Sequence, residues 1–201
     1  MKQFILAMLM LLPLAATAQD NTWERVETTA ASNPDAKYLA GAVPEEDGRV
    51  VFTANIKAPG KSAGEIYRLL KSDFELMTKE ANQLDQSRVT VADSTKMQLV
   101  AAYQEWLVFT NRLLSLDRTR LFFTLIADCR DGEATVKLTR IHYLYDEERN
   151  PTTYKAEEWI TDRYGLNKKK TKLSRISGKF RRKTIDRKDY LFNRFSILLN
   201  K

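Results

Sequence analysis

Residues 120–145, RLFFTLIADCRDGEATVKLTRIHYLY, contain the clearest hairpin pattern of the chain. Two runs rich in apolar and β-branched residues flank Asp131-Gly132, a dipeptide that supplies the positive backbone angles of a two-residue hairpin turn. If this turn sets the register, alternate residues of the two strands meet on one apolar face, and polar residues fall on the other. The predicted pairs of the apolar face are Cys129 with Ala134, Ala127 with Val136, and Leu125 with Leu138.

A strand and a helix precede this hairpin. Alternating apolar residues predict a strand over 50–56, and Pro59-Gly60 ends it. Ser62 and Glu65 then have the spacing of a capping box, in which each side chain satisfies a free backbone N–H of a new helix. Apolar residues at helical spacing behind this box predict a helix of about 20 residues. They are Ile66, Leu69, Leu70, Phe74 and Met77.

Further elements are predicted on both sides of the hairpin. Residues 88–92 and 97–109 are predicted strands, although the second range also contains residues that suit a helix. After the hairpin, 156–164 can form a short helix that Gly165 ends, and 186–199 predicts a terminal helix with one apolar face. The expected fold is therefore α+β, with a single antiparallel sheet in the order strand, helix, four strands, helix. The two long helices are expected to cover one face of this sheet.

The N-terminus has the order of a secretory signal peptide. Lys2 precedes an apolar run over 4–14, and Ala16-Thr17-Ala18 matches a small-residue cleavage site. The run is shorter than the roughly 20 apolar residues that cross a bilayer. No cysteine directly follows the site to serve as the acceptor of a lipoprotein. We therefore expect cleavage after Ala18 and export to the periplasm, the outer membrane or the medium.

Three segments are expected along the chain. Residues 1–18 form the signal peptide, 19–47 a polar N-terminal leader, and 48–200 a single α+β domain. The leader contains turn-forming residues and shows no sustained periodicity. It can add one short element by packing Trp23 or Tyr38 against the domain.

Several kinds of active site lack the residues they need. His142 is the only histidine and Cys129 the only cysteine, so neither a site of several histidine ligands nor an internal disulfide can form. In the predicted register His142 lies opposite Leu121, on the face that carries Cys129 but roughly 27 Å along the strand from it. A nucleophile and its base must be in contact, so this pair is not expected to react. A buried, inert Cys129 is expected instead.

Other enzyme signatures are also missing. The sequence has neither a glycine-rich phosphate loop nor a dinucleotide-binding motif. Glu157 and Glu158 are neighbours, and on a helix they would point about 100 degrees apart, so they would not converge as the carboxylates of a glycosidase do. The sequence therefore predicts a protein that is not an enzyme and has no cofactor.

Basic charge is concentrated in one segment. The chain has a formal net charge of +7, and residues 168–188 hold eleven basic residues and one acid. Such a segment attracts anionic partners, which in the envelope are lipopolysaccharide phosphates, anionic lipids, acidic glycans and acidic proteins. Phe180 and Ile176 could add insertion into such a surface, whereas nucleic acid is not expected in this compartment. The candidate contacts are Lys168, Lys169, Lys170, Lys172, Arg175, Lys179, Arg181, Arg182 and Lys183.

A structural role for this basic segment is the alternative. Lysine and arginine are common in solvated loops, and on an edge strand they discourage sheet-to-sheet aggregation. Under that interpretation the segment binds no partner.

Two stretches near the C-terminus, EEWI at 157–160 and KLSRISGKFRRK at 172–183, together with Arg130-Asp131-Gly132, resemble a family of exported proteins from Bacteroides-like bacteria. This family is domain of unknown function 4468. The resemblance covers about 50–199 and implies a fold like that of the TATA-binding protein. It implies no catalytic residues. It does not imply DNA binding either, because the DNA saddle consists of two such units and fold alone does not carry function.

Two functions from different classes remain open. The first is a non-catalytic module for binding or assembly in the envelope, which contacts anionic surfaces through its basic segment. The second is a carrier of a small apolar ligand, similar to helix-grip proteins, in which a curved sheet and the terminal helix enclose the ligand. A carrier requires an apolar cavity of about 300 Å³ or more between the sheet and that helix.

Overall fold

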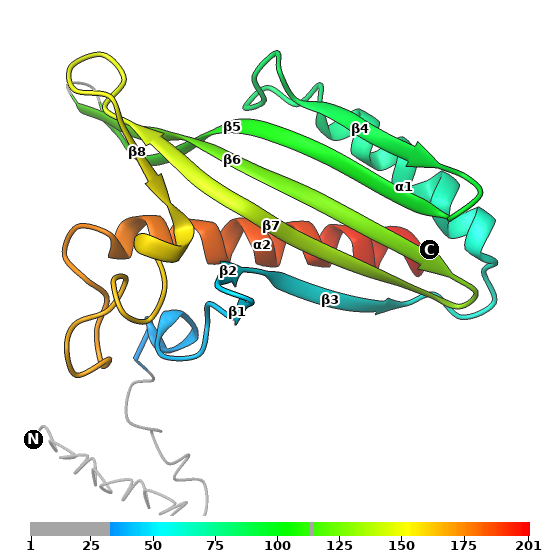
Figure 1. The fold of residues 1–201 in the computed structure, drawn as a ribbon, viewed down its shortest axis with the longest axis horizontal. Coiled ribbons are helices and arrows are strands. Elements are labelled where there is room, and N and C mark those ends of the chain that lie inside the picture. Colours follow the sequence, from blue (N-terminus) through cyan, green and yellow to red (C-terminus); the bar gives the residue numbers. More distant parts are fainter. Residues whose placement is uncertain (1–32, 113–114) are drawn as a thin grey trace, which may run out of the picture. The chain divides into compact units, whose positions relative to one another are not determined.

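Six antiparallel strands form one sheet, and two long helices pack against one of its faces (Figure 1). The structure is a computed structural model that describes residues 33–112 and 115–201, and Pro34–Lys201 form one compact unit. The strands of the sheet are β3 (Phe52–Lys57), β4 (Arg88–Asp93), β5 (Gln98–Arg112), β6 (Ser115–Arg130), β7 (Glu133–Tyr145) and β8 (Thr152–Lys155). The long helices are α1 (Ala63–Met77) and α2 (Gly178–Leu199).

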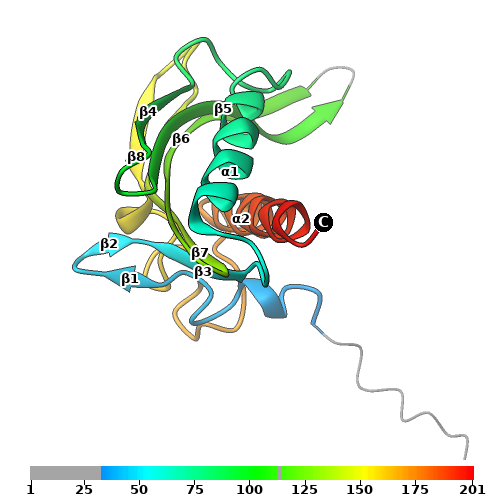
Figure 2. The ribbon, with the colours of Figure 1, turned by 90° about the vertical axis from the view of Figure 1, so that its right-hand side faces the viewer.

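The strands lie in the order β3-β7-β6-β5-β4, and β8 pairs with β7. Figure 2 shows that the sheet curves around α2, with both helices on its concave, inner face. A separate two-stranded ribbon, β1 (Glu45–Glu46) and β2 (Arg49–Val50), precedes β3. The α+β class and the coverage of one face by two helices are confirmed. Five strands of the sheet lie between the helices where four were predicted, because 152–155 forms the additional strand β8 beside β7.

The hairpin of β6 and β7 has the predicted register around its turn. Gly132 has a φ of 74°, and the three predicted apolar pairs face each other as expected. All six side chains of these pairs are buried, with Leu125 fully so. The register of the hairpin between its turn at Asp131-Gly132 and the pair of Leu125 with Leu138 therefore follows from the turn type and from the alternation of the strands.

A β-bulge in β7 changes the register farther from the turn. Phe122 faces His142, whereas Thr124 faces Thr139, so β7 has one extra residue between these pairs. Arg140 lies in the bulge with a φ of 55°. An extra residue reverses the alternation of the strand beyond it. The prediction that His142 lies opposite Leu121 on the inner face is therefore wrong, and its side chain is half-buried on the outer face.

Helix α1 begins at the predicted capping box. The hydroxyl of Ser62 accepts a hydrogen bond of 3.3 Å from the backbone N–H of Glu65. The helix has 15 residues, fewer than predicted, and ends at Met77. Four of the five stripe residues are fully buried against the sheet, and Leu69 is partly buried. The apolar stripe thus determined which side of this helix faces the core.

Helix α2 begins at Gly178, eight residues before the predicted start at Asp186. The earlier turns carry many cations, which obscured their apolar stripe in the sequence. Phe180 is fully buried and contacts Tyr143 and Phe109 with ring centroids 5.1 and 4.6 Å apart. The prediction that Phe180 inserts into an external surface is therefore wrong, and 178–185 is neither loop nor edge strand.

Aromatic side chains fill the space between the inner face of the sheet and the helices. Phe74 packs on Phe195, and Tyr103 stacks on Phe123, with ring centroids 5.5 and 5.2 Å apart. The hydroxyl of Tyr143 is 2.7 Å from that of Thr184 on α2. Three surface pockets of about 650, 480 and 340 Å³ were found among the described residues, and none of them is lined by the aromatic side chains named here. The observed core is thus closely packed, as expected for a protein interior.

Part of the predicted leader belongs to the compact unit. Residues Ala36–Tyr38 form a short 3-10 helix, and Tyr38 and Val43 are buried in the core. Tyr38 therefore packs on the domain as predicted, while Trp23 and the predicted signal peptide lie outside the described residues. Within the described part of the chain, the helices lack the combination of length and apolar character that a bilayer span needs.

One predicted helix does not form. The range 156–164 contains only a 3-10 turn, Ala156–Glu158, followed by further turns. Trp159 leaves the helical conformation and stacks on Tyr154 of β8, with ring centroids 3.8 Å apart. This tertiary contact overrides the local preference for a helix.

Candidate functional site

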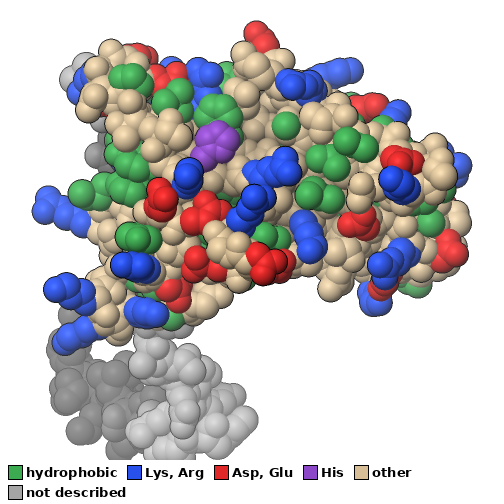
Figure 3. Space-filling view, viewed as in Figure 1, with side chains coloured by type: hydrophobic (Ala, Val, Ile, Leu, Met, Phe, Trp, Pro, Cys, Tyr) green, Lys and Arg blue, Asp and Glu red, His purple; other side chains and the backbone are tan. Residues whose placement is uncertain are grey.

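The structure divides the basic segment into an exposed loop and a largely paired helix. Residues 168–175 lie in the connection that precedes α2, and 179–188 lie in α2 itself. Figure 3 shows Lys and Arg side chains at the lower left of the molecule, where this connection lies in Figure 1. The two parts have different environments, so they are considered separately.

The lysine loop, residues 167–172, is a defined turn. At its base Leu166 forms a β-bridge with Leu173. The side-chain oxygen of Asn167 accepts hydrogen bonds from the backbone N–H groups of Thr171 and Lys172, at 2.9 and 3.2 Å. Because the side chain of Asn167 bonds to the other end of the turn, the backbone that carries the lysines has a defined conformation.

The four lysines of the loop are exposed, and none forms an ion pair with a carboxylate of the described residues. They are Lys168, Lys169, Lys170 and Lys172. Arg175 is also exposed. Two large apolar residues flank the loop, namely Tyr164, which is 42% exposed, and Ile176, which is 65% exposed. Ile176, the other residue considered for insertion into a surface, is thus exposed, and the loop presents cations beside apolar side chains.

Arg181 was a candidate surface contact, but it is completely buried. Its Nε and Nη2 donate to the carbonyl oxygens of Tyr38 and Leu39, both at 2.6 Å. Nη1 donates to the carbonyl oxygen of Ile160 at 2.7 Å, and Nη2 also donates to Asp162 at 2.7 Å. Burial lowers the pKa of this guanidinium, which Asp162 partly offsets. Arg181 therefore joins the N-terminal segment to α2 and cannot touch an external anion.

Lys179 and Arg182 also have internal partners. Lys179 donates to Asp117 at 2.6 Å and to the Tyr145 hydroxyl at 3.0 Å. Arg182 pairs with Asp35 at 2.6 Å. Lys183 is half-buried on the same helix. Lys179 and Arg182, two of the candidate contacts, are thus already paired with neighbouring carboxylates, although 45% of the Arg182 side chain is exposed.

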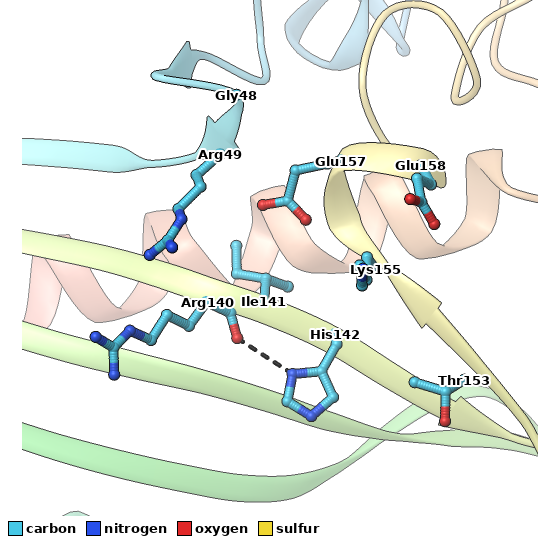
Figure 4. Close-up of a pocket in the computed structure, with 9 residues that line it drawn as sticks. All are labelled: Gly48, Arg49, Arg140, Ile141, His142, Thr153, Lys155, Glu157 and Glu158. Carbon is cyan, nitrogen blue, oxygen red and sulfur yellow. Dashed lines mark hydrogen bonds between the residues drawn. The ribbon is translucent and has the colours of Figure 1, made fainter.

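A second candidate site lies on the outer face of the sheet. It is a pocket of about 650 Å³ between the ribbon before β3, the bulged part of β7, and β8 with the turn that follows it (Figure 4). Its lining residues are Gly48, Arg49, Arg140, Ile141, His142, Thr153, Lys155, Glu157 and Glu158. This outer pocket combines cations, acids and one aromatic ring.

The geometry of the outer pocket depends on the bulge. The imidazole of His142 stacks on Phe122, with ring centroids 4.3 Å apart and planes at 11°. Its Nδ1 lies 3.3 Å from the carbonyl oxygen of Arg140. On the opposite side Glu157 accepts a hydrogen bond of 2.8 Å from the backbone N–H of Val50. Figure 4 shows His142 and Glu157 on two sides of the space that the lining residues share.

Sequence reasoning missed this pocket. The divergence expected of Glu157 and Glu158 assumed a helix that does not form, and both residues line the outer pocket. Arg49, Arg140 and Lys155 are far apart in the sequence and belong to different strands. The pairing of β7 with β8 brings Arg140 and Lys155 together, and β2 packs beside β7 and adds Arg49. The local sequence gives no sign of a bulge at a residue with a large side chain.

Cys129 and His142 do not form a catalytic pair. Cys129 is buried on the inner face, and the bulge turns His142 to the outer face. Among the described residues, no group of three or more potential ligands could hold a metal ion. Burial, with a smaller effect from Asp128, raises the pKa of the Cys129 thiol to about 11. The buried state expected for this cysteine is confirmed.

We expect Cys129 to be nearly inert in the native protein. At about pH 8 the raised pKa keeps the thiol protonated, and the thiolate is the nucleophile. Ellman's reagent should therefore label Cys129 at least about tenfold more slowly in the native protein than in urea. Equal rates in the two states would contradict the buried position.

Comparisons with known proteins agree with this fold. A family model described as a domain of unknown function (DUF4468) with TBP-like fold matches residues 52–144. The crystal structure of a DUF4468 family protein from Bacteroides ovatus is 41% identical, with a TM-score of 0.77, over 83% of this chain and 95% of that chain. A TBP-like protein from Parabacteroides distasonis is 19% identical, with a TM-score of 0.64, over 78% of this chain and 96% of that chain. The second likeness shows the fold alone.

The search of curated proteins gave no match. The family description and both solved structures assign a fold and no activity. With 41% identity to a family member over most of both chains, this protein belongs to the DUF4468 family and has its TBP-like α+β fold.

Proposed function

We propose that this protein is an exported, non-catalytic binding module that contacts an anionic envelope surface through its lysine loop. The observation that carries the proposal is the exposure of four lysines, without ion pairs to carboxylates of the described residues, on a turn fixed by Asn167. Anionic lipids and lipopolysaccharide phosphates are the expected surfaces. Tyr164 and Ile176 add apolar contact at the boundary of such a surface.

The carrier function has less support. A helix-grip carrier needs an apolar cavity between the sheet and α2, where this structure places fully buried rings of Phe74, Tyr143, Phe180 and Phe195. The largest of the three pockets lies on the outer face of the sheet and not between the sheet and α2. The geometry therefore favours a surface-binding module.

Replacing Lys168, Lys169, Lys170 and Lys172 with Gln should strongly weaken binding to anionic vesicles. Each lysine near an anionic surface contributes about 1 kcal/mol at low salt, so the variant should lose roughly 3–4 kcal/mol of binding free energy. Cosedimentation with vesicles of phosphatidylglycerol and phosphatidylethanolamine, and with lipopolysaccharide, measures this loss. Raising the salt from about 0.1 M to 1 M should weaken wild-type binding similarly, since the screening length falls from about 10 Å to 3 Å.

A matched variant separates the loop from net charge. Lys57, Lys79, Lys96 and Lys201 are exposed outside the lysine loop, so replacing these four with Gln makes the same change in net charge. This control should retain most of the binding, and both variants should unfold at nearly the wild-type temperature. If wild type does not bind at low salt, or if both variants lose binding equally, the lysine loop is not a binding site.

A further inference from the structure

We infer that the outer pocket binds an acidic saccharide, in which one or more sugar rings carry a carboxylate. This inference concerns a different surface from the lysine loop and does not depend on the proposed contact with the envelope. It rests on three features of the pocket, which are its unpaired cations, its flat aromatic floor and its fixed carboxylate.

The first feature is a group of cations from separate strands. Arg49 lies on β2, Arg140 in the bulge of β7 and Lys155 at the end of β8, and all three line the pocket. None of them forms an ion pair with a carboxylate of the described residues. Arginine can hold a carboxylate through two parallel hydrogen bonds, so this group suits the acid of a ligand.

The second feature is the floor formed by the ring of His142. The ring is held nearly parallel to Phe122, which supports it from the neighbouring strand. A flat ring that is partly open to solvent can pack against the C–H face of a sugar, because such a face is weakly apolar and complements the negative face of an aromatic ring. The bulge is the reason that this ring faces outward.

The bulge itself is an unusual arrangement. A φ of 55° at Arg140 is uncommon for a residue with a Cβ atom. Bulges of this kind occur often beside binding sites, where they redirect a side chain. Here the bulge directs both Arg140 and His142 to the pocket. An arginine and an aromatic ring placed together in this way indicate a ligand site more specifically than a solvated patch of basic residues does.

The third feature is the acid side of the pocket. Glu157 is held by the Val50 N–H, and Glu158 lines the pocket beside it. Carboxylates accept hydrogen bonds from sugar hydroxyls but repel a ligand that carries only negative groups. Cations and hydroxyl acceptors in one pocket thus fit a sugar acid better than a free phosphate. A volume of about 650 Å³ is also within the range of small-ligand pockets.

The test measures binding of trigalacturonate to the purified mature protein by isothermal titration calorimetry. The neutral trisaccharide galactotriose is the matched ligand. We expect the acid to bind and the neutral sugar to bind at least about tenfold more weakly, because only the acid engages the arginines. An amino acid with both charges, glutamate, tests the competing possibility of a zwitterionic ligand.

The key variant is Arg140→Asn. Asparagine tolerates positive φ better than most residues, so the bulge and the position of His142 should persist while the guanidinium is lost. Binding of trigalacturonate should fall at least about tenfold, since one charge-assisted contact is removed. Arg130→Asn is the matched control, because Arg130 is an exposed arginine of β6 that does not line the pocket. It should bind like wild type.

Several results would overturn the inference. They are no binding of trigalacturonate at millimolar concentration, equal binding of galactotriose, tighter binding of glutamate, or equal affinities of Arg140→Asn and Arg130→Asn. The fourfold Gln variant of the lysine loop should keep its affinity for trigalacturonate, and Arg140→Asn should keep its affinity for vesicles. The two assays therefore test the outer pocket and the lysine loop independently, so one proposal can fail while the other stands.

Discussion

Replacing Leu125 with Asp is expected to unfold the domain. Leu125 lies in the middle of β6, pairs with Ala101 and Leu138 on the two neighbouring strands, and has no exposed surface. An unpaired charge at such a position costs several kcal/mol. Whole domains are stable by only about 5–15 kcal/mol. Circular dichroism during thermal unfolding should show a large drop in the midpoint, or no folded protein at all.

The next residue along β6 provides the control. Ile126 is half-buried on the outer face, so Ile126→Asp places the same charge where water can reach it. This variant should fold and lose far less stability. Equal melting temperatures for Leu125→Asp and wild type would show that the alternation of the hairpin is wrong.

Arg181→Met is expected to cause the second largest loss of stability. Methionine keeps much of the apolar stem of Arg181 but removes all of its hydrogen bonds. The carbonyl oxygens of Tyr38 and Ile160 then lose their donor, and that of Leu39 keeps only the backbone N–H of Ala42. Breaking a buried ion pair from one side costs about 3–5 kcal/mol. The lower end applies here, because Asp162 is partly exposed and still accepts a hydrogen bond from the Gly41 N–H.

Urea unfolding measures the effect of Arg181→Met directly. Lys168→Met is the matched control, since it removes one exposed charge from the same basic segment and should change the unfolding free energy by only a few tenths of a kcal/mol, roughly. Arg181→Lys should fall between them, because an ammonium group lacks the planar fork of donors. If Arg181→Met costs less than about 1 kcal/mol, the guanidinium does not hold the N-terminal segment as described.

Other cations of α2 also bind internal partners, as Arg181 does. Arg187 donates two hydrogen bonds of 2.8 Å to Glu105, a carboxylate that is 1% exposed on β5. Arg194 pairs with Asp73 of α1 at 2.7 Å. These pairs attach the terminal helix to the sheet and to α1. Much of the positive charge that made the C-terminus look like a binding segment therefore serves the internal structure.

Features that depend on neighbours along the chain could be predicted from the amino-acid sequence. Asp131-Gly132 specifies a turn through its own backbone preferences, and alternation from that turn specifies the first three apolar pairs of the hairpin. Ser62 and Glu65 specify a helix start in the same local way.

Features that depend on residues distant in the sequence became visible in the folded chain alone. Arg181 and Lys168 belong to the same charge run, yet one is buried because three carbonyl groups and Asp162 surround it, while the other meets no such group. The bulge at Arg140 placed His142 outside by adding one residue to a strand, which alternation alone cannot reveal. A local pattern specifies which backbone states a residue prefers. Burial, pairing and pocket formation depend on which distant residues the fold brings within a few ångströms.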